Sequence, residues 1–157
     1  MKVVIDFKRI FQYICTTALS VAIIWGANFG ANFLISLSKR SNFDLYVMSF
    51  HKVRNTGAAF NLFSNNPDFV VALSFLALAG IIFFVLFCSR KLNTLNTTAL
   101  SILSAGIGMN FYERITKGYV IDYIDLNFIP NMPVFNVADI FIVIGTILLI
   151  AALFVKK

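Results

Sequence analysis

The sequence predicts an all-α membrane protein with four transmembrane helices and a small extracytoplasmic β-rich surface segment. Of the 157 residues, 59% are hydrophobic and only 13% are charged, whereas soluble domains carry about a quarter charged residues. Four stretches remain almost free of charge over the roughly 20 residues that a helix needs to cross the hydrocarbon core. Lipid offers the backbone no hydrogen bonds, so each stretch must be helical.

The expected spans comprise residues 10–38, 69–89, 92–112 and 134–155, the last interrupted only by Asp139. The first span follows basic residues as a signal peptide would, but it is too long for one and three more spans follow. No internal repeat or linker divides the chain. We therefore expect residues 1–157 to form a single integral membrane domain.

Two polar segments connect the spans on one side, residues 39–68 and residues 113–133. Residues 43–53 are rich in aromatic and β-branched side chains and are followed by turn-forming residues, and residues 119–124 have a similar composition. Gly118 is expected to end the third helix. The two segments therefore predict a short strand or hairpin and a second extended piece, lying over the helix ends.

The net charge of +6 indicates orientation in a membrane, and in a chain this apolar it does not indicate a nucleic-acid partner. After four crossings, both termini and the loop at residues 90–91 share one side. Basic residues sit tight against the span ends there, and the positive-inside rule places that side in the cytoplasm: Lys2, Lys8, Arg9, Arg90, Lys91, Lys156 and Lys157. The segments 39–68 and 113–133 are then extracytoplasmic.

The residues that hold metals or form disulfides are scarce. Cys15 and Cys88 both lie in long apolar runs, where a thiol behaves as a small hydrophobic group. His51 is the only histidine. We therefore expect no metal and no other cofactor.

Asp139 is the most informative residue, because an ionisable group inside a membrane helix is costly and points to function. Asn136 precedes it by three residues and shares its helix face. If the third and fourth helices are antiparallel neighbours, their connection can bring Asp122 beside Asp139. Two shielded carboxylates share a proton and can activate water, which is the chemistry of an aspartic protease. The structural alternative is a helix-dipole contact for Asp139 and an ordinary loop position for Asp122.

Four sequence blocks follow one another along the chain: Val53 to Phe60, Asn110 with Arg114, Gly118 to Tyr123, and Phe135 to Asp139. In this order they resemble the motifs of the lipoprotein signal peptidases, the four-span type II signal peptidases of bacterial plasma membranes. The resemblance implies a metal-independent aspartic endopeptidase that removes signal peptides from prolipoproteins, just ahead of a diacylglyceryl-modified cysteine. It assigns Asp122 and Asp139 as the catalytic pair.

The resemblance and the residue chemistry together give a set of expected substrate-binding residues: Asn55, Gly57, Ala58, Asn110, Arg114, Asn136 and Ala138. The amides and the arginine can donate hydrogen bonds, and the small residues leave room for a peptide backbone. The expected partners are a lipidated prolipoprotein and membrane lipids. We expect a monomeric, multi-pass protein of the bacterial plasma (inner) membrane, with its active site near the extracytoplasmic face.

Three features depart from the family pattern. An acidic and a basic residue one turn apart in the first span are replaced by Asn28 and Asn32, which predicts an amide pair. Met109 stands where the family has glycine, and Glu113 where it has aspartate. These changes affect supporting positions and leave Asp122 and Asp139 intact.

Two other functions fit parts of the sequence. One is a small four-span transporter or channel subunit that uses Asp139 as an ion or proton site. The other is a homologue that binds lipoproteins without cutting them. A conduit needs polar groups through the whole membrane depth, yet Ile140 to Val155 carries only Thr146 as a polar side chain. That pattern favours the protease.

Overall fold

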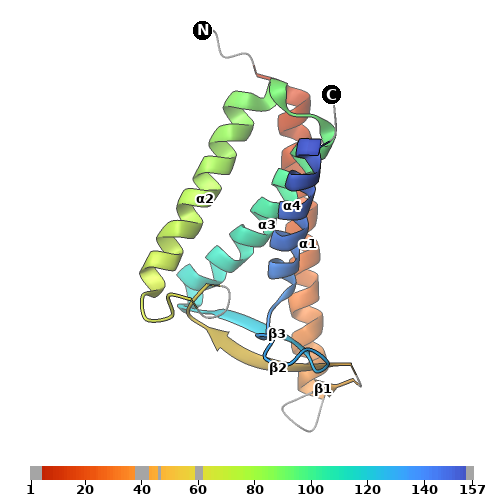
Figure 1. Ribbon diagram of the computed structural model, residues 1–157, viewed down its shortest axis with the longest axis vertical. Helices are drawn as coiled ribbons and strands as arrows, with labels where there is room; N and C mark the ends of the chain where they lie inside the picture. The colour runs from red at the N-terminus through yellow and green to blue at the C-terminus, as the bar shows by residue number, and fades with distance from the viewer. Residues whose placement is uncertain (1–4, 38–42, 46, 59–61, 155–157) are drawn as a thin grey trace.

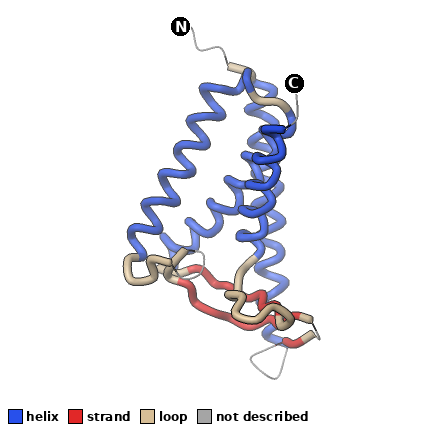
Figure 2. The backbone as a smooth tube through the Cα atoms, in the orientation of Figure 1, coloured by secondary structure: helices blue, strands red, loops and turns tan. Residues whose placement is uncertain are grey.

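The computed structural model describes residues 5–37, 43–45, 47–58 and 62–154, and in these ranges it contains four long helices and a small sheet at one end of them (Figures 1 and 2). The elements in chain order are α1 (Phe7–Leu37), β1 (Phe43–Asp44), β2 (Met48–Asn55), α2 (Pro67–Cys88), the 3-10 turn η2 (Ser89–Lys91), α3 (Thr94–Lys117), β3 (Val120–Leu126) and α4 (Val137–Phe154). The mainly helical architecture with a small sheet agrees with the sequence prediction.

Local sequence signals set both ends of α3. At its start, the side chain of Asn93 accepts a hydrogen bond from the backbone N–H of Asn96 at 2.8 Å, as N-cap residues do. At its end, Gly118 adopts a left-handed conformation with φ of 81°, and its N–H donates to the carbonyl of Arg114. Glycine tolerates this conformation without steric cost. The prediction that Gly118 ends the helix is therefore confirmed.

Three helical segments are long and apolar enough to cross a membrane: Phe7–Leu37, Pro67–Lys91 and Val137–Phe154. Among the described residues, α3 does not meet this criterion, so the expectation of four such helices is met for three. The physical reason is the position of α3, which contacts α1, α2 and α4. A helix covered by its neighbours does not need an apolar surface, and α3 buries the polar residues Thr97, Ser101, Ser104, Asn110 and Arg114.

Hydroxyl groups join α1 to α3. The phenol of Tyr13 donates to Oγ of Ser104 at 2.8 Å. The hydroxyl of Ser101 lies within 2.8 Å of the Thr97 carbonyl and 3.3 Å of the Tyr13 carbonyl. Hydrogen bonds of this kind hold helices together where both are apolar elsewhere.

Two glycines bring α3 and α4 into close contact. A Cβ atom at Gly106 would lie 2.5 Å from the carbonyl oxygen of Ala138, and one at Gly145 would lie 2.7 Å from the backbone nitrogen of Leu103. Real side chains do not approach backbone atoms so closely. The two helices therefore pack backbone against backbone, as small residues allow in membrane proteins.

The sheet has the order β1-β2-β3 with antiparallel pairing throughout. Val53 is opposite Asp122 and Asn55 is opposite Val120, with an irregularity in β2 between Phe50 and Val53. On one side, Tyr123 and Ile124 of β3 pack against Ala31 of α1. This contact fixes the sheet across one end of the helices (Figure 1), and the strands agree with the extended segments that the sequence predicts.

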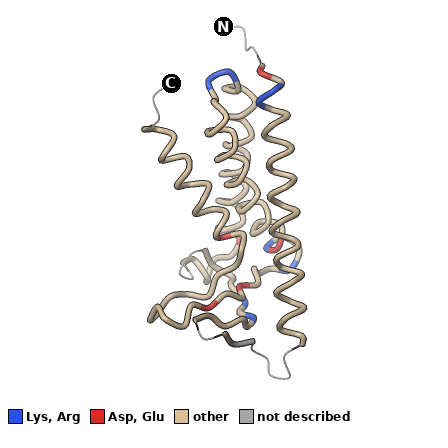
Figure 3. The backbone as a smooth tube through the Cα atoms, turned by 90° about the vertical axis from the view of Figure 1, so that its right-hand side faces the viewer, with Lys and Arg blue, Asp and Glu red and all other residues tan. Residues whose placement is uncertain are grey.

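Charged residues gather at the two ends of the molecule and leave the long middle free (Figure 3). Arg9 and the Arg90–Lys91 turn lie at the end away from the sheet. Lys2, Lys156 and Lys157, which also contribute to the predicted orientation, lie outside the described residues. The charge pattern therefore marks two polar ends separated by an apolar band.

Candidate active site

The two aspartates are close because β3 pairs with the residues that lead into α4. The backbone N–H of Ile124 donates to the Phe135 carbonyl at 2.8 Å, and the N–H of Phe135 donates back at 3.0 Å. Asp122 lies two residues before Ile124 in β3, and Asp139 lies in the first turn of α4. The return of the chain between α3 and α4 thus brings both residues to one end of the helices.

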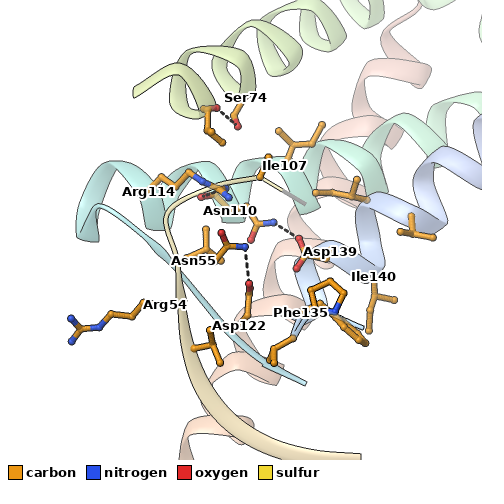
Figure 4. A pocket seen from close by; sticks show the side chains of 18 of the residues that line it. Arg54, Asn55, Ser74, Ile107, Asn110, Arg114, Asp122, Phe135, Asp139 and Ile140 are labelled. Carbon is orange, nitrogen blue, oxygen red and sulfur yellow. Dashed lines mark hydrogen bonds between the residues drawn. The ribbon is translucent and has the colours of Figure 1, made fainter. Parts of the chain in front are cut away.

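A chain of amide hydrogen bonds connects the two carboxylates. Nδ2 of Asn136 donates to Oδ1 of Asp122 at 2.8 Å and to Oδ1 of Asn110 at 3.1 Å. Nδ2 of Asn110 then donates to Oδ1 of Asp139 at 2.7 Å, and the Asp139 side chain points toward Asn110 (Figure 4). Each carboxylate is therefore oriented by an asparagine, and the two asparagines orient each other.

Asp139 is also bonded to the start of its own helix. Its Oδ2 accepts a hydrogen bond from the Asn136 backbone N–H at 3.0 Å, and Oδ1 of Asn136 accepts one from the Asp139 N–H at 3.1 Å. This reciprocal pattern is a capping box, which satisfies backbone donors that a helix start leaves free. The carboxylate of Asp139 is thus fixed through both of its oxygens.

The turn after β2 supplies the other partner of Asp122. Nδ2 of Asn55 donates to Oδ2 of Asp122 at 2.9 Å, while Oδ1 of Asn55 accepts from the Gly57 N–H at 2.9 Å. Arg114 ties this turn to α3, because its Nη2 donates to the Gly57 carbonyl at 2.5 Å and its Nη1 to the Asn110 carbonyl at 3.3 Å. Arg114 therefore holds two backbone carbonyl groups, one in α3 and one in the turn.

Burial changes the ionisation of Asp122, whose exposed fraction is only 2%. Loss of hydration raises the pKa of Asp122 to about 6, and the negative charge of Asp139 acts in the same direction. Hydrogen bonds from Asn55 and Asn136 and the charge of Arg114 oppose the shift. Desolvation is the largest effect, as expected for a carboxyl taken out of water. Asp122 therefore keeps a proton closer to neutral pH than an exposed carboxyl does.

A cleft of 760 Å³ opens at the two aspartates. Asn55, Ala58, Asn110 and Arg114 line it together with Asp122 and Asp139. The rest of the lining is mostly apolar and comes from α2, α3, α4, the strands β2 and β3, and the segment before α4. The three other predicted binding residues are buried behind this surface: Asn136 behind Asp122, Gly57 under the Arg114 guanidinium, and Ala138 against Gly106. The structure thus brings all nine predicted residues into one region, with six of them facing the cleft.

The positions that depart from the family pattern have structural partners. Oε2 of Glu113 accepts a hydrogen bond from the Ile121 N–H at 2.9 Å, and its Oε1 pairs with Lys117 at 2.7 Å. Met109 packs against the cluster of Ile24, Ala105 and Ala138. Glu113 therefore joins the end of α3 to β3, beside Asp122.

The expected amide pair in α1 takes a different form. Nδ2 of Asn32 donates to the backbone carbonyl of Asn28 at 2.8 Å, while Oδ1 of Asn28 accepts a hydrogen bond from the Tyr123 hydroxyl at 2.7 Å. The prediction that the two side chains pair with each other is wrong, because Asn28 has a better partner in β3. Sequence reasoning missed this contact, as it missed the role of Gly106, since both depend on helix packing.

A model of the family described as "Signal peptidase (SPase) II", Peptidase_A8, matches residues 20–155. A lipoprotein signal peptidase of Streptococcus thermophilus is 37% identical over 111 residues, which are 71% of each chain. A lipoprotein signal peptidase of Microcystis aeruginosa is 40% identical over 111 residues, which are 71% of this chain and 70% of the relative. The family model's match, residues 20–155, includes the helices and strands of the candidate site.

Two solved structures described as a bacterial membrane enzyme studied by the in meso method have the same fold. The one at 2.3 Å resolution has a TM-score of 0.75 and 27% identity, covering 92% of this chain and 88% of the other. The one at 1.9 Å resolution has a TM-score of 0.74 and 26% identity, with full coverage of both chains. By the family match and the relatives, this chain belongs to the signal peptidase II family of aspartic endopeptidases, multi-pass bacterial membrane proteins that process lipoproteins.

Proposed function

We propose that this chain removes signal peptides from diacylglyceryl-modified prolipoproteins, using a water molecule that Asp122 and Asp139 activate together. The observation that carries this proposal is the hydrogen-bonded chain from Asp122 through Asn136 and Asn110 to Asp139. Both carboxylates also open into the same cleft. A pair of carboxyl groups with one shared proton can act as base and acid in the same reaction.

In the proposed reaction, one carboxylate takes a proton from water while the water oxygen attacks the scissile carbonyl carbon. The other carboxyl group donates its proton to the carbonyl oxygen, which gives a tetrahedral intermediate with two hydroxyl groups. When the carbon–nitrogen bond breaks, a proton passes to the nitrogen and the new acid leaves. A pKa of about 6 for Asp122 supports a pair that retains one proton near neutral pH. No acyl-enzyme is required.

The surrounding residues have distinct roles in this proposal. Asn55 and Asn110 each donate to one aspartate, so they hold the two carboxylates in fixed orientations. Arg114 holds the turn that carries Asn55. Ala58, on the wall of the cleft, leaves space for the substrate backbone. Asn136 and Ala138 act from behind, by fixing the start of α4.

Membrane placement follows from the polar ends and the apolar band. We place α3 across the membrane as a fourth span, because its neighbours α1, α2 and α4 cover it. Both termini then face the cytoplasm, and the sheet and the cleft lie at the extracytoplasmic face. The apolar residues that α2, α3 and α4 contribute to the cleft suit the apolar helix of a signal peptide and the lipid chains beside it: Val70, Leu73, Ile107 and Val143. Because one chain supplies the whole site, we propose that it acts as a monomer.

A cleavage assay in detergent or lipid with a diacylglyceryl-modified prolipoprotein peptide tests this function. Asp122→Asn and Asp139→Asn are each expected to lower turnover by about a thousandfold or more, as loss of one member of a catalytic unit does. Asp125→Asn is the matched control, because Asp125 lies in the same strand and contacts His51 at 3.9 Å. Native-like turnover in either Asp122→Asn or Asp139→Asn would refute the proposal. Binding without cleavage by the native chain would identify a homologue that does not cut.

A further inference from the structure

Tyr123, the residue after Asp122, makes a contact that the proposed reaction does not use. Its side chain is 4% exposed and belongs to the apolar cluster between β3 and α1. At the end of this buried ring, the hydroxyl donates a hydrogen bond to Oδ1 of Asn28 at 2.7 Å. A buried tyrosine usually finds a partner for its hydroxyl, and here that partner lies in the middle part of a transmembrane helix.

The Tyr123 side chain also lies next to the start of α4, because Val137 packs against the apolar cluster that contains it. Burial raises the pKa of Tyr123 to about 12, and a hydrogen bond with the backbone of Val137 opposes the increase. Val137 is the first residue of α4 and lies two residues before Asp139. Tyr123 therefore joins three elements: β3, α1 through its hydroxyl, and the first turn of α4 through the packing of Val137.

We propose that Tyr123 is a positioning residue that holds the two aspartate-bearing elements, β3 and α4, in a fixed relation through its hydrogen bond with Asn28. This inference rests on the proposed function. Asp122 comes directly before Tyr123 in the strand, and Asp139 lies in the turn whose first residue faces the phenol. A movement of the ring would therefore displace both carboxylates, one through each element.

The orientation of β3 separates this role from substrate binding. The lining of the cleft includes Asp122 and does not include Tyr123, whose side chain packs in the cluster with Ala31 of α1. On the other flank of Asp122, the Ile121 N–H is held by Glu113. Both neighbours of Asp122 in the strand are thus held in place. Of the two, Tyr123 is the one that packs with a residue of α4, Val137. Loss of the hydroxyl should change the rate of the chemical step and leave substrate affinity nearly unchanged.

The test compares Tyr123→Phe, Asn28→Leu and the double variant in the lipopeptide cleavage assay. Each single variant is expected to lower kcat by about tenfold and to change KM by less than about twofold, because misplaced reacting groups slow chemistry more than binding. The double variant should be no slower than the slower single one, since both changes remove the same hydrogen bond. Asn28→Asp keeps an accepting oxygen in the same place and should restore kcat to within about threefold of the native value.

Ser49→Ala is the matched control, because Oγ of Ser49 is buried in the same sheet and donates to Oδ1 of Asn127 at 3.0 Å, far along the strands from Asp122. Its kcat should equal that of the native chain. The inference is overturned if Tyr123→Phe keeps the native kcat, or if its KM rises while its kcat does not fall. It is also overturned if Ser49→Ala lowers kcat as much as Tyr123→Phe does. If Tyr123→Phe does not fold, the kcat values of Asn28→Leu and Asn28→Asp test the same inference. The proposed function fails separately, if Asp122→Asn and Asp139→Asn still cleave.

Discussion

The helices α2 and α3 have similar lengths and opposite surroundings. Of the 22 residues of α2, only Val70 and Val85 are buried, and Figure 1 shows this helix standing apart from the others. Of the 24 residues of α3, nine are buried, and five of these are polar or charged. The more apolar helix is thus the one that contacts the protein least. In this molecule, an apolar sequence goes with an exposed helix surface, which suits contact with lipid, and a polar sequence goes with contact to other helices and to the site.

The largest effect is expected in a comparison in which one glycine of α3 and one glycine of α2 are each replaced by alanine. Gly106→Ala in α3 places a methyl group against the Ala138 carbonyl, which forces α3 and α4 apart beside Asn110 and Asp139. We expect cleavage to fall about a hundredfold and the free energy of unfolding to fall by about 2 kcal/mol. Peptide cleavage and thermal unfolding in detergent measure the two effects.

Gly80→Ala in α2 is the matched control, because nothing lies within 4 Å of the added methyl group. It should retain native cleavage and stability. If Gly106→Ala also behaves as the native chain does, the close contact of α3 and α4 is not what holds the two residues together.

A second test compares the carboxylates of the two regions. The pKa of Asp122 is about 6 in the folded chain, above its ordinary value of 3.8. The folded state therefore favours the protonated carboxyl. The stability that this protonated group contributes is complete below about pH 4 and is lost as the pH rises through 6. Asp122→Asn should therefore increase the free energy of unfolding by about 3 kcal/mol at pH 8. The difference should vanish below pH 4, and chemical unfolding at several pH values measures it.

Asp68→Asn, in the first turn of α2, is the corresponding change outside the site. Its exposed carboxylate interacts favourably with the helix N-terminus, so its loss should lower the free energy of unfolding by about 0.5 kcal/mol. The opposite signs of the two effects distinguish a carboxylate placed for chemistry from one placed for helix stability. Equal signs at pH 8 would contradict the burial argument for Asp122.

The last comparison, also with a small expected effect, concerns the hydroxyl groups between α1 and α3. Tyr13→Phe removes the hydrogen bond to Ser104 and should lower the free energy of unfolding by about 0.6 kcal/mol, a typical value for such bonds in membranes. Leu76→Ala in α2, where the side chain is 65% exposed, should have less effect. A larger loss from Leu76→Ala would mean that α2 has a protein contact that its exposed surface does not indicate.

The sequence predicts the helices well because their signals are local. Charged or turn-forming residues flank each apolar run, and Gly118 ends α3 where expected. The two aspartates and their asparagines are also predictable, since the antiparallel return of the chain and the family motifs both point to them. The extended segments become β2 and β3 because aromatic and β-branched residues favour a half-buried sheet.

The contacts that complete the site could not be predicted in this way. The bond between Tyr123 and Asn28 joins residues 95 positions apart, and the need for Gly106 depends on the path of α4. Asn136 was expected to line the site, yet it lies behind Asp122 and bridges it to Asn110. Such arrangements follow from how whole helices pack, and spacing along the chain does not encode them.

The capping box at the start of α4 links assembly to reactivity. Asp139 closes the first turn of its own helix, and only a formed turn presents its carboxylate to Asn110. In a newly inserted chain in which α4 has not yet docked, the two aspartates are therefore not joined through Asn110 and Asn136. If the two aspartates act together as proposed, such an immature chain does not cleave neighbouring peptides.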